Sequence, residues 1–304
     1  MGTRAGTVAS VDLLIATDGS EHSHRAIRSV AALDWPNGTR ARLITVIPEV
    51  IDLAGVVVED LMQAQISEAM DGTLARAREL MGPLRDRTQR AVLRGRPADA
   101  ILEGADAFAA DLVVLGHRGR GPVAARLLGS VAAEVAERSR RAVLIVRGDI
   151  VGPVVLADDG SAPARAARRI IATWPMFERR EIRVISVATV AAPLASGIAI
   201  TMREEAAAAR REEVAQALAV RSLSAREAEV ELRAAGRDVS VTLATGDPGH
   251  EICALARMVH AGLVVVGCRG HNVFAGLLGT TAKGTVLGAP CSVLVVHAPA
   301  ASKR

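Results

Sequence analysis

Aromatic residues are nearly missing from this sequence. It has no tyrosine, three phenylalanines and two tryptophans among 304 residues. So few rings leave no stacking platform for a single-stranded nucleic acid. Half of the residues are hydrophobic, which indicates a packed globular protein with an aliphatic core rather than a disordered chain. The length is sufficient for two ordinary domains, each with its own core.

Lysine is also scarce, because only Lys283 and Lys303 occur among 37 basic residues. The net charge is +4, and the arginines are scattered along the chain rather than gathered in one block. Such a modest excess is weak support for a nucleic-acid partner. The composition therefore predicts an arginine-rich, solvated surface and no nucleic acid.

Cysteine is too rare and too scattered to build a structural framework. Cys253, Cys268 and Cys291 form no C-x-x-C pair, and their number is odd. A disulfide scaffold and a structural zinc site are both disfavoured, and a reducing compartment fits. The first apolar run after the N-terminus is too short for the hydrophobic region of a signal peptide. We therefore expect a cytoplasmic protein.

Charge is absent from one stretch, the 19 residues 184–202. Its length could span a membrane. However, it contains Pro193, Gly197 and several hydroxyl side chains, and it starts as a β-branched run. We interpret the stretch as a strand followed by a loop, and we expect no membrane segment.

An internal duplication organises the whole chain. Segments recur in the same order at an offset that grows from 141 to 150 residues, which is typical of a repeated unit. The matching pairs are 11–27 with 153–170, 33–36 with 172–175, 42–48 with 183–189, 92–102 with 242–253, 111–119 with 262–270, and 142–147 with 292–297. Residues 147–153 form the natural join, so we predict domains at 1–148 and 152–304.

Strands and helices alternate in each copy. In the first copy, short apolar runs without clean alternation predict strands at 11–16, 41–47, 90–94, 111–115 and 142–147, buried on both faces in a parallel sheet. Helices are predicted at 21–33 after Ser20, at 57–81, at 98–109 after Pro97 and at 130–138, with a longer one at about 202–235 in the second copy. The pattern is that of a doubly wound α/β domain, present twice.

Glycines follow the fourth predicted strand in both copies. Gly116, Gly119 and Gly129 precede Ser130, and a similar loop leads to Gly279 and Thr280. Ligands of open parallel sheets bind at the carboxyl ends of the strands, where the strand order reverses. Glycine lets backbone N–H groups approach an anion, and a helix N-terminus supplies further donors. The loop is consistent with a phosphate cradle, which we favour over the alternative that the glycines only permit tight turns.

These residues carry a resemblance. Both halves are similar to the universal stress protein family, whose motif G-x2-G-x9-G-(S/T) the first copy meets in full, together with "DGS" after the first strand. The resemblance covers essentially the whole chain. It implies five-stranded sheets of order 3-2-1-4-5, whose final strands (142–147 and 292–297) pair antiparallel to make an intramolecular pseudo-dimer, with a homodimer as a further option. It also implies binding of ATP or another adenine nucleotide.

The resemblance also implies which residues contact the nucleotide. In the first copy Ala16, Thr17 and Asp18 border the ribose and phosphates, Val46 faces the adenine, and Gly116, Arg118, Gly119, Gly129, Ser130 and Val131 hold the phosphates. In the second copy the counterparts are Ala157, Asp158, Asp159, Val187, Gly267, Arg269, Gly270, Gly279, Thr280 and Thr281.

Asp18 has two interpretations of its own. A carboxylate beside phosphates needs a neutralising cation, and Mg²⁺ would bridge the two, with Asp159 in the same role in the second copy. Alternatively, Asp18 caps the helix that begins near Ser20. The sequence leaves both open.

The two copies are not expected to bind equally. The second loop has eight residues between Gly270 and Gly279 where the first has nine between Gly119 and Gly129, and it has fewer arginines. Asp158 replaces Thr17, so two carboxylates would face the phosphates unless the shorter loop moves Asp158 away. We therefore expect the first site to be the better one.

Two further functions compete with that of a nucleotide-binding stress regulator. A slow ATP hydrolase would need a group that positions water, for which His117 and His22 are candidates. The second copy has Cys268 at the first of these positions and Pro163 at the second, which disfavours this alternative. The other is a dimerisation scaffold with degenerate sites, against which the intact first motif argues.

Overall fold

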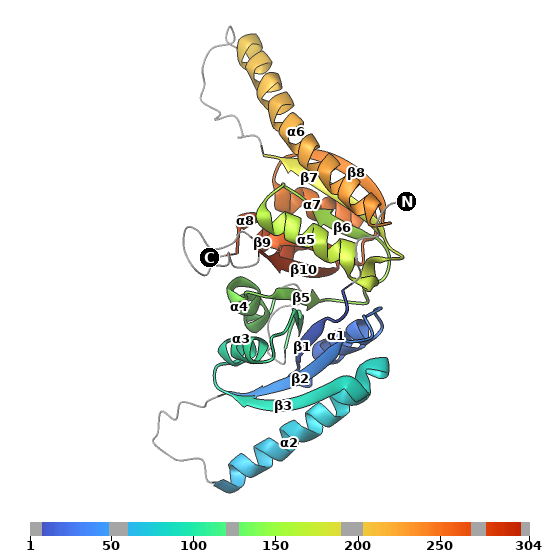
Figure 1. Cartoon of the computed structure of the whole chain (residues 1–304). Helices are drawn as coiled ribbons and strands as arrows, with labels where there is room; N and C mark the ends of the chain where they lie inside the picture. The colour runs from blue at the N-terminus through green and yellow to red at the C-terminus, as the bar shows by residue number, and fades with distance from the viewer. Residues whose placement is uncertain (1–7, 49–59, 120–127, 190–202, 269–277, 299–304) are drawn as a thin grey trace, which may run out of the picture.

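The computed structural model describes residues 8–48, 60–119, 128–189, 203–268 and 278–298, with the side chains of 60–64 and 203–210 excepted. Figure 1 shows two α/β halves stacked along one axis, with the first half in blue and green and the second in yellow to red. Each half alternates strands with helices, as the sequence predicts.

Within the described residues, the first half contains five strands and four α-helices. Its elements are β1 (Asp12–Ala16), α1 (Glu21–Ala31), β2 (Arg40–Ile47), α2 (Asp60–Glu79), the 3₁₀ helix η1 (Gly82–Arg87), β3 (Thr88–Arg94), α3 (Pro97–Ala107), β4 (Leu112–Gly116), α4 (Ser130–Arg138) and β5 (Ala142–Val146).

The second half repeats this order with a longer second α-helix, α6. Its elements are β6 (Val154–Ala157), α5 (Ala162–Thr173), the 3₁₀ helix η2 (Pro175–Phe177), β7 (Glu181–Ala188), α6 (Arg203–Ala234), β8 (Asp238–Thr245), α7 (Pro248–Met258), β9 (Leu263–Cys268), α8 (Thr280–Gly288) and β10 (Ser292–His297).

All ten strands form one sheet in the order β3-β2-β1-β4-β5-β10-β9-β6-β7-β8. Neighbours within each half are parallel, and the order 3-2-1-4-5 occurs in both, as predicted. The halves meet where β5 pairs antiparallel with β10, with Leu144 opposite Leu294. The predicted pairing of the two final strands is therefore confirmed, and no sheet edge is left bare there.

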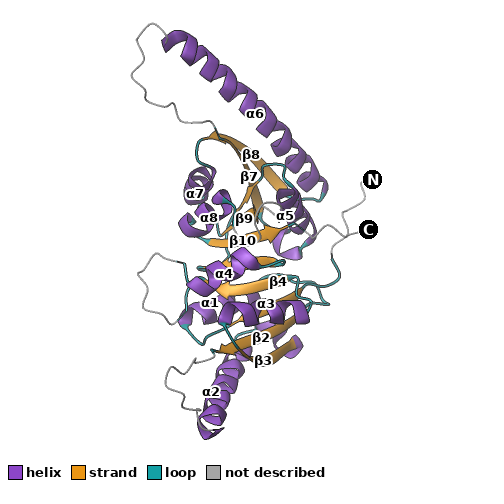
Figure 2. Ribbon diagram, turned by 90° about the vertical axis from the view of Figure 1, so that its left-hand side faces the viewer, coloured by secondary structure: helices purple, strands orange, loops and turns teal. Residues whose placement is uncertain are grey.

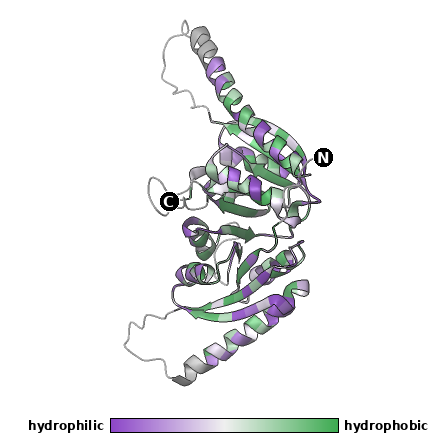
Figure 3. Cartoon of the chain, viewed as in Figure 1, coloured by the Kyte–Doolittle hydropathy of each residue, from purple (hydrophilic) through white to green (hydrophobic). Residues whose placement is uncertain are grey.

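Helices cover both faces of the sheet (Figure 2). One core contains residues of α1, α2, α5 and α6, and the other contains residues of α3, α4, α7 and α8. Each core runs through the junction of the halves, because alternate residues of β5 and β10 point into opposite cores: Leu144 and Leu294 into the first, Val143 and Val293 into the second. The green central strands in Figure 3 show the aliphatic composition of these cores.

Local signals placed several helix ends correctly. Ser20 is the N-cap of α1 and accepts a hydrogen bond from the Ser23 amide, and Pro97 occupies the first turn of α3. The structure corrects the expectation that the strand near 90–94 is buried on both faces. Gln89 and Arg90 of β3 are exposed, because β3 is the outermost strand of its half.

The uncharged stretch 184–202 begins as strand β7, as predicted. Its remainder, residues 190–202, lies outside the described residues. Within the described part of the chain, no helix is long and apolar enough to cross a membrane.

Candidate functional site

A cavity of about 340 Å³ opens between the carboxyl ends of β1 and β4, where the strand order of the first half reverses. It is built from the loop after β1, the end of β2, the glycine loop after β4 and the first turn of α4. All ten residues expected in the first copy lie around it: Ala16, Thr17, Asp18, Val46, Gly116, Arg118, Gly119, Gly129, Ser130 and Val131.

The loop after β1 is held by its own side chains. Thr17 Oγ1 accepts from the Gly19 amide at 3.1 Å and lies 2.9 Å from Ser23 Oγ. Gly19 adopts φ 74°, a conformation that favours glycine. Asp18 Oδ1 accepts from the Ser20 amide at 3.0 Å. The capping interpretation of Asp18 is therefore wrong in its detail, since the N-cap of α1 is Ser20 and Asp18 makes a turn before it.

Close approach, rather than unusual backbone angles, explains the glycines of the motif. A Cβ on Gly116 would lie 2.9 Å from the His22 carbonyl oxygen, and a Cβ on Gly119 would lie 2.7 Å from Asp18 Oδ2. The counterpart Gly267 would place a Cβ 2.9 Å from the Ala164 nitrogen. None of these three has a positive φ. Gly116 and Gly267 therefore let the ends of β4 and β9 touch the first turns of α1 and α5.

The N-terminus of α4 closes one side of the cavity. Gly129 is its N-cap, makes no side-chain cap, and donates its amide to the His117 carbonyl at 2.8 Å. Ser130, Val131 and Ala132 in the first turn line the cavity. The N–H groups of a first helical turn have no partner within the helix, and they bring partial positive charge to this wall.

Another part of the lining is apolar. It consists of Ile44, Val46, Pro97, Ile101 and Leu115, from β2, α3 and β4. The cavity thus combines apolar residues suited to a flat hydrophobic ring with a helix N-terminus suited to an anion. Pro97 and Ile101 were not expected from the sequence, because nothing in α3 marks the face that it turns toward the site.

Positive charge at the polar end comes from Arg118, which lines the cavity. Two further arginines of the same loop, Arg120 and Arg126, lie outside the described residues. His117 does not line the cavity. Its ring packs edge-on against His22 with the centroids 4.6 Å apart, and its Nδ1 lies 3.3 Å from the Val146 carbonyl. Burial, together with His22 and Arg147, lowers the pKa of His117 to about 4, so the ring is neutral at pH 7.

The second cavity lies at the equivalent reversal, between β6 and β9, and measures about 90 Å³. Eight of the ten expected residues line it: Ala157, Asp158, Asp159, Val187, Gly267, Gly279, Thr280 and Thr281. Arg269 and Gly270 lie outside the described residues. Arg221, from α6, also lines this cavity and donates from Nη1 to the Asp159 carbonyl at 2.8 Å.

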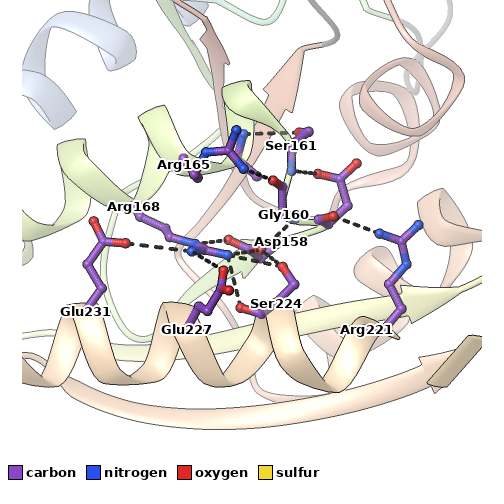
Figure 4. A network of polar contacts seen from close by, with 11 residues as sticks. Asp158, Gly160, Ser161, Arg165, Arg168, Arg221, Ser224, Glu227 and Glu231 are labelled. Atoms are coloured by element: carbon purple, nitrogen blue, oxygen red, sulfur yellow. Dashed lines mark hydrogen bonds and ion pairs between the residues drawn. The ribbon is translucent and has the colours of Figure 1, made fainter. Parts of the chain in front are cut away.

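Asp158 corrects one expectation about this second cavity. Its carboxylate, 0% exposed, pairs with Arg168 of α5 at 2.6 and 2.7 Å and accepts from Ser224 Oγ at 2.6 Å. Figure 4 shows this network joining α5, α6 and the loop after β6. The negative charge of Asp158 is therefore paired with Arg168 inside the protein, although the residue also borders the cavity. The carboxylates of Asp158 and Asp159 were both expected to repel phosphate in this cavity. Only the Asp159 carboxylate lies outside the ion pair with Arg168.

Sequence reasoning missed Arg168, Ser224 and Arg221, although a signal existed. Ala225, Ala228 and Leu232 are fully buried at helical spacing, and Arg221 stands one turn before Ala225 on the same face. The position of Arg221 at the end of this apolar stripe indicates that it lies where α6 leaves the core. The sequence does not indicate which loop Arg221 contacts there, because that depends on tertiary packing.

The arrangement defines a class of protein: a tandem doubly wound α/β chain with a cavity at each reversal of strand order. The model of the universal stress protein family matches residues 12–147 and 151–297. Because these matches cover nearly the whole chain, the chain belongs to the universal stress protein family.

Individual relatives agree with this assignment. A universal stress protein of Thermus aquaticus is 35% identical over 136 residues, which is 44% of this chain and 97% of that protein. The crystal structure of a universal stress protein from Archaeoglobus fulgidus covers 93% of this chain and 97% of its own, with a TM-score of 0.66 at 21% identity, and so shares the fold. A universal stress protein crystallised in complex with cAMP is 31% identical over 46% of this chain and 98% of its own, with a TM-score of 0.32.

Proposed function

We propose that this chain binds ATP or another adenine nucleotide in the first cavity and acts in the stress response through that occupancy. The cavity at the β1–β4 reversal carries the proposal. It joins an apolar wall of Ile44, Val46 and Ile101 to a helix N-terminus and Arg118, which is the distribution of chemistry that a base with phosphates requires.

Mg²⁺ is part of this proposal. Asp18 lines the polar end, and its Oδ2 is the atom that a Cβ on Gly119 would strike, so the carboxylate faces the glycine loop. Mg²⁺ commonly binds through one or two carboxylates plus phosphate oxygens and water. Asp18 would be its protein ligand at the first site, and Asp159 at the second. Among the described residues no group of three or more His, Cys, Asp or Glu could hold a metal alone, which agrees with a cation that arrives with the nucleotide.

Regulation rather than fast catalysis is the proposed outcome of binding. The two histidines considered for positioning water pack against each other and are not among the described residues that line the first cavity. We therefore expect hydrolysis to be slow. The pairing of β5 with β10 supports an intramolecular pseudo-dimer as the working unit, and the three free cysteines fit a cytoplasmic location.

The test begins with the protein as purified. It is denatured, and any released nucleotide is identified by mass spectrometry. Isothermal titration with ATP, with and without Mg²⁺, then compares the parent with Gly129→Glu, which places a carboxylate at the N-cap of α4. Gly72→Glu is the matched control, because Gly72 is exposed on α2 and a Cβ there meets nothing within 4 Å.

The expected result is that Gly129→Glu loses the tighter ATP-binding event and Gly72→Glu retains it. Mg²⁺ should strengthen ATP binding in the parent, and Asp18→Asn should remove that gain. Absence of adenine-nucleotide binding by the parent, or equal binding by Gly129→Glu, would refute the proposed function.

A further inference from the structure

Helix α6 lines the second cavity, whereas no described residue of its counterpart α2 lines the first. In the second cavity Arg221 of α6 is the one basic side chain among the described lining residues. Figure 4 shows Arg221 reaching from α6 toward the loop that contains Gly160.

The position of Arg221 is fixed from both ends. At the side-chain end, Nη1 donates to the Asp159 carbonyl at 2.8 Å. At the helix end, Ser224 lies one turn further along α6, where its carbonyl and hydroxyl oxygens accept from Arg168 Nη2 at 3.0 and 3.1 Å. Since Arg168 also holds Asp158, one network anchors both α6 and the loop after β6. Arg221 is therefore held at the rim rather than free to swing away.

The carboxylates of the network are held by Arg168 rather than by Arg221. Arg168 is hydrogen-bonded to Asp158 and lies 3.7 Å from a carboxylate oxygen of Glu227 and of Glu231. The Asp159 carboxylate accepts from the Ser161 amide at 3.0 Å. The hydrogen bond to Asp159 uses one of the five N–H donors of a guanidinium, whose fork geometry suits a phosphate group. The first turn of α8, with Thr280 and Thr281, lines the same cavity. An anion there would meet Arg221 and the helix N-terminus together.

The cavity also restricts the size of the ligand. It measures about 90 Å³, compared with about 340 Å³ at the first site, and α6 contributes to its wall. A ligand with fewer phosphates requires less of this enclosed space than a triphosphate does.

We infer that Arg221 is a ligand-binding residue of the second cavity, where it contacts the phosphate group of a nucleoside monophosphate. This rests on the proposed function, namely that the cavities at the two reversals bind nucleotides. It assigns to α6 the contact with the phosphate group, which the glycine loop is proposed to make in the first half. The two halves then differ in the nucleotide that they bind as well as in how tightly they bind it.

The experiment measures nucleotide binding at the second cavity in a protein whose first cavity is disabled by Gly129→Glu. In this background, isothermal titration with AMP compares the protein that retains Arg221 with the variants Arg221→Gln and Arg221→Lys. Arg226→Gln is the matched control, since Arg226 is exposed on the same helix. Adenosine, which lacks the phosphate, is titrated in parallel. Thermal melting of each variant confirms that it folds.

Arg221→Gln should weaken AMP binding at least about tenfold, which corresponds to about 1.4 kcal/mol. Arg221→Lys should restore part of this loss. Arg226→Gln should bind AMP as the background does, and adenosine binding should be equal in all variants. ATP binding at the first site, measured with Gly129 intact, should be unchanged by Arg221→Gln.

The inference is overturned if Arg221→Gln binds AMP as tightly as the background, if it weakens adenosine equally, or if the second cavity binds neither compound while the first binds ATP. Failure of the proposed function looks different, because then the parent protein binds no adenine nucleotide at either site.

Discussion

Replacing Arg168 by methionine removes the cation that neutralises a fully buried carboxylate. Arg168 is 2% exposed and Asp158 3%, and their side chains are joined by two hydrogen bonds of 2.6 and 2.7 Å. Removing one partner of a buried ion pair leaves an uncompensated charge and costs roughly 3–5 kcal/mol. We therefore expect Arg168→Met to lower the free energy of unfolding by about that amount.

The first half supplies the comparison that makes this prediction sharp. Thr17 and Ile27 occupy the positions of Asp158 and Arg168 in the repeat, and Ile27 is completely buried without any ion pair. Thr17 Oγ1 also accepts from Gly19, as Asp158 Oδ1 accepts from Gly160. The neutral residues Thr17 and Ile27 are therefore compatible with the same loop conformation and the same hydrogen bond to the loop amide. The double variant Asp158→Thr/Arg168→Met should be more stable than either single variant by about 2 kcal/mol or more, because well-packed neutral residues often replace a buried pair at little cost.

Urea unfolding followed by circular dichroism provides the assay, with the parent, both single variants and the double variant measured together. The double-mutant cycle gives the coupling energy between the two positions directly. If Arg168→Met costs less than about 1 kcal/mol, or if the two single effects simply add, then the pair is not a buried, mutually neutralising one and the reasoning fails.

Three further predictions concern the first half. Gly116→Ala should destabilise the protein by roughly 1–3 kcal/mol in thermal melting, because its Cβ would lie 2.9 Å from the His22 carbonyl oxygen, whereas Gly72→Ala should not. Stability should fall as the pH drops from about 6.5 toward 4, because the unfolded chain takes up a proton on His117 in that window while the native protein, with its pKa lowered to about 4, does not. His117→Gln should reduce the loss of unfolding free energy over this pH range by about 1 kcal/mol, a value lowered because His117 is partly exposed. An unchanged slope of stability against pH would contradict the lowered pKa of His117. Turnover of ATP should stay far below the ~10 s⁻¹ typical of enzymes, and a rate near that value would show that the protein is a hydrolase.

Much of the first site could be predicted from sequence because its residues belong to short local motifs. "TDGS" after β1 and the glycines after β4 lie directly beyond apolar strands, and parallel strands bring their carboxyl ends to one edge of the sheet. That geometry alone gathers Asp18, Gly116, Gly129 and Ser130 around one cavity. The repeat then predicted the second cavity from the first.

The reason for the individual glycines was only partly visible. Sequence motifs show that a side chain is missing, but they do not show which neighbour would collide with it. For Gly116 the neighbour is the His22 carbonyl of α1, and for Gly119 it is the carboxylate of Asp18. Both contacts join segments that are far apart in the sequence, and the first of them depends on how α1 packs against β4.

Local hydrophobic pattern and turn chemistry are sufficient to predict the alternation of strands and helices, their order in each half, and the polar loops at the strand ends. The pairing of Asp158 and the position of Arg221 follow from tertiary packing. The position of Arg221 and the hydrogen bond from Ser224 to Asp158 both depend on where α6 lies, and that position is set by the burial of Ala225, Ala228 and Leu232. The carboxylate of Asp158 looks repulsive in the sequence, but in the fold it is buried and paired with Arg168 of α5.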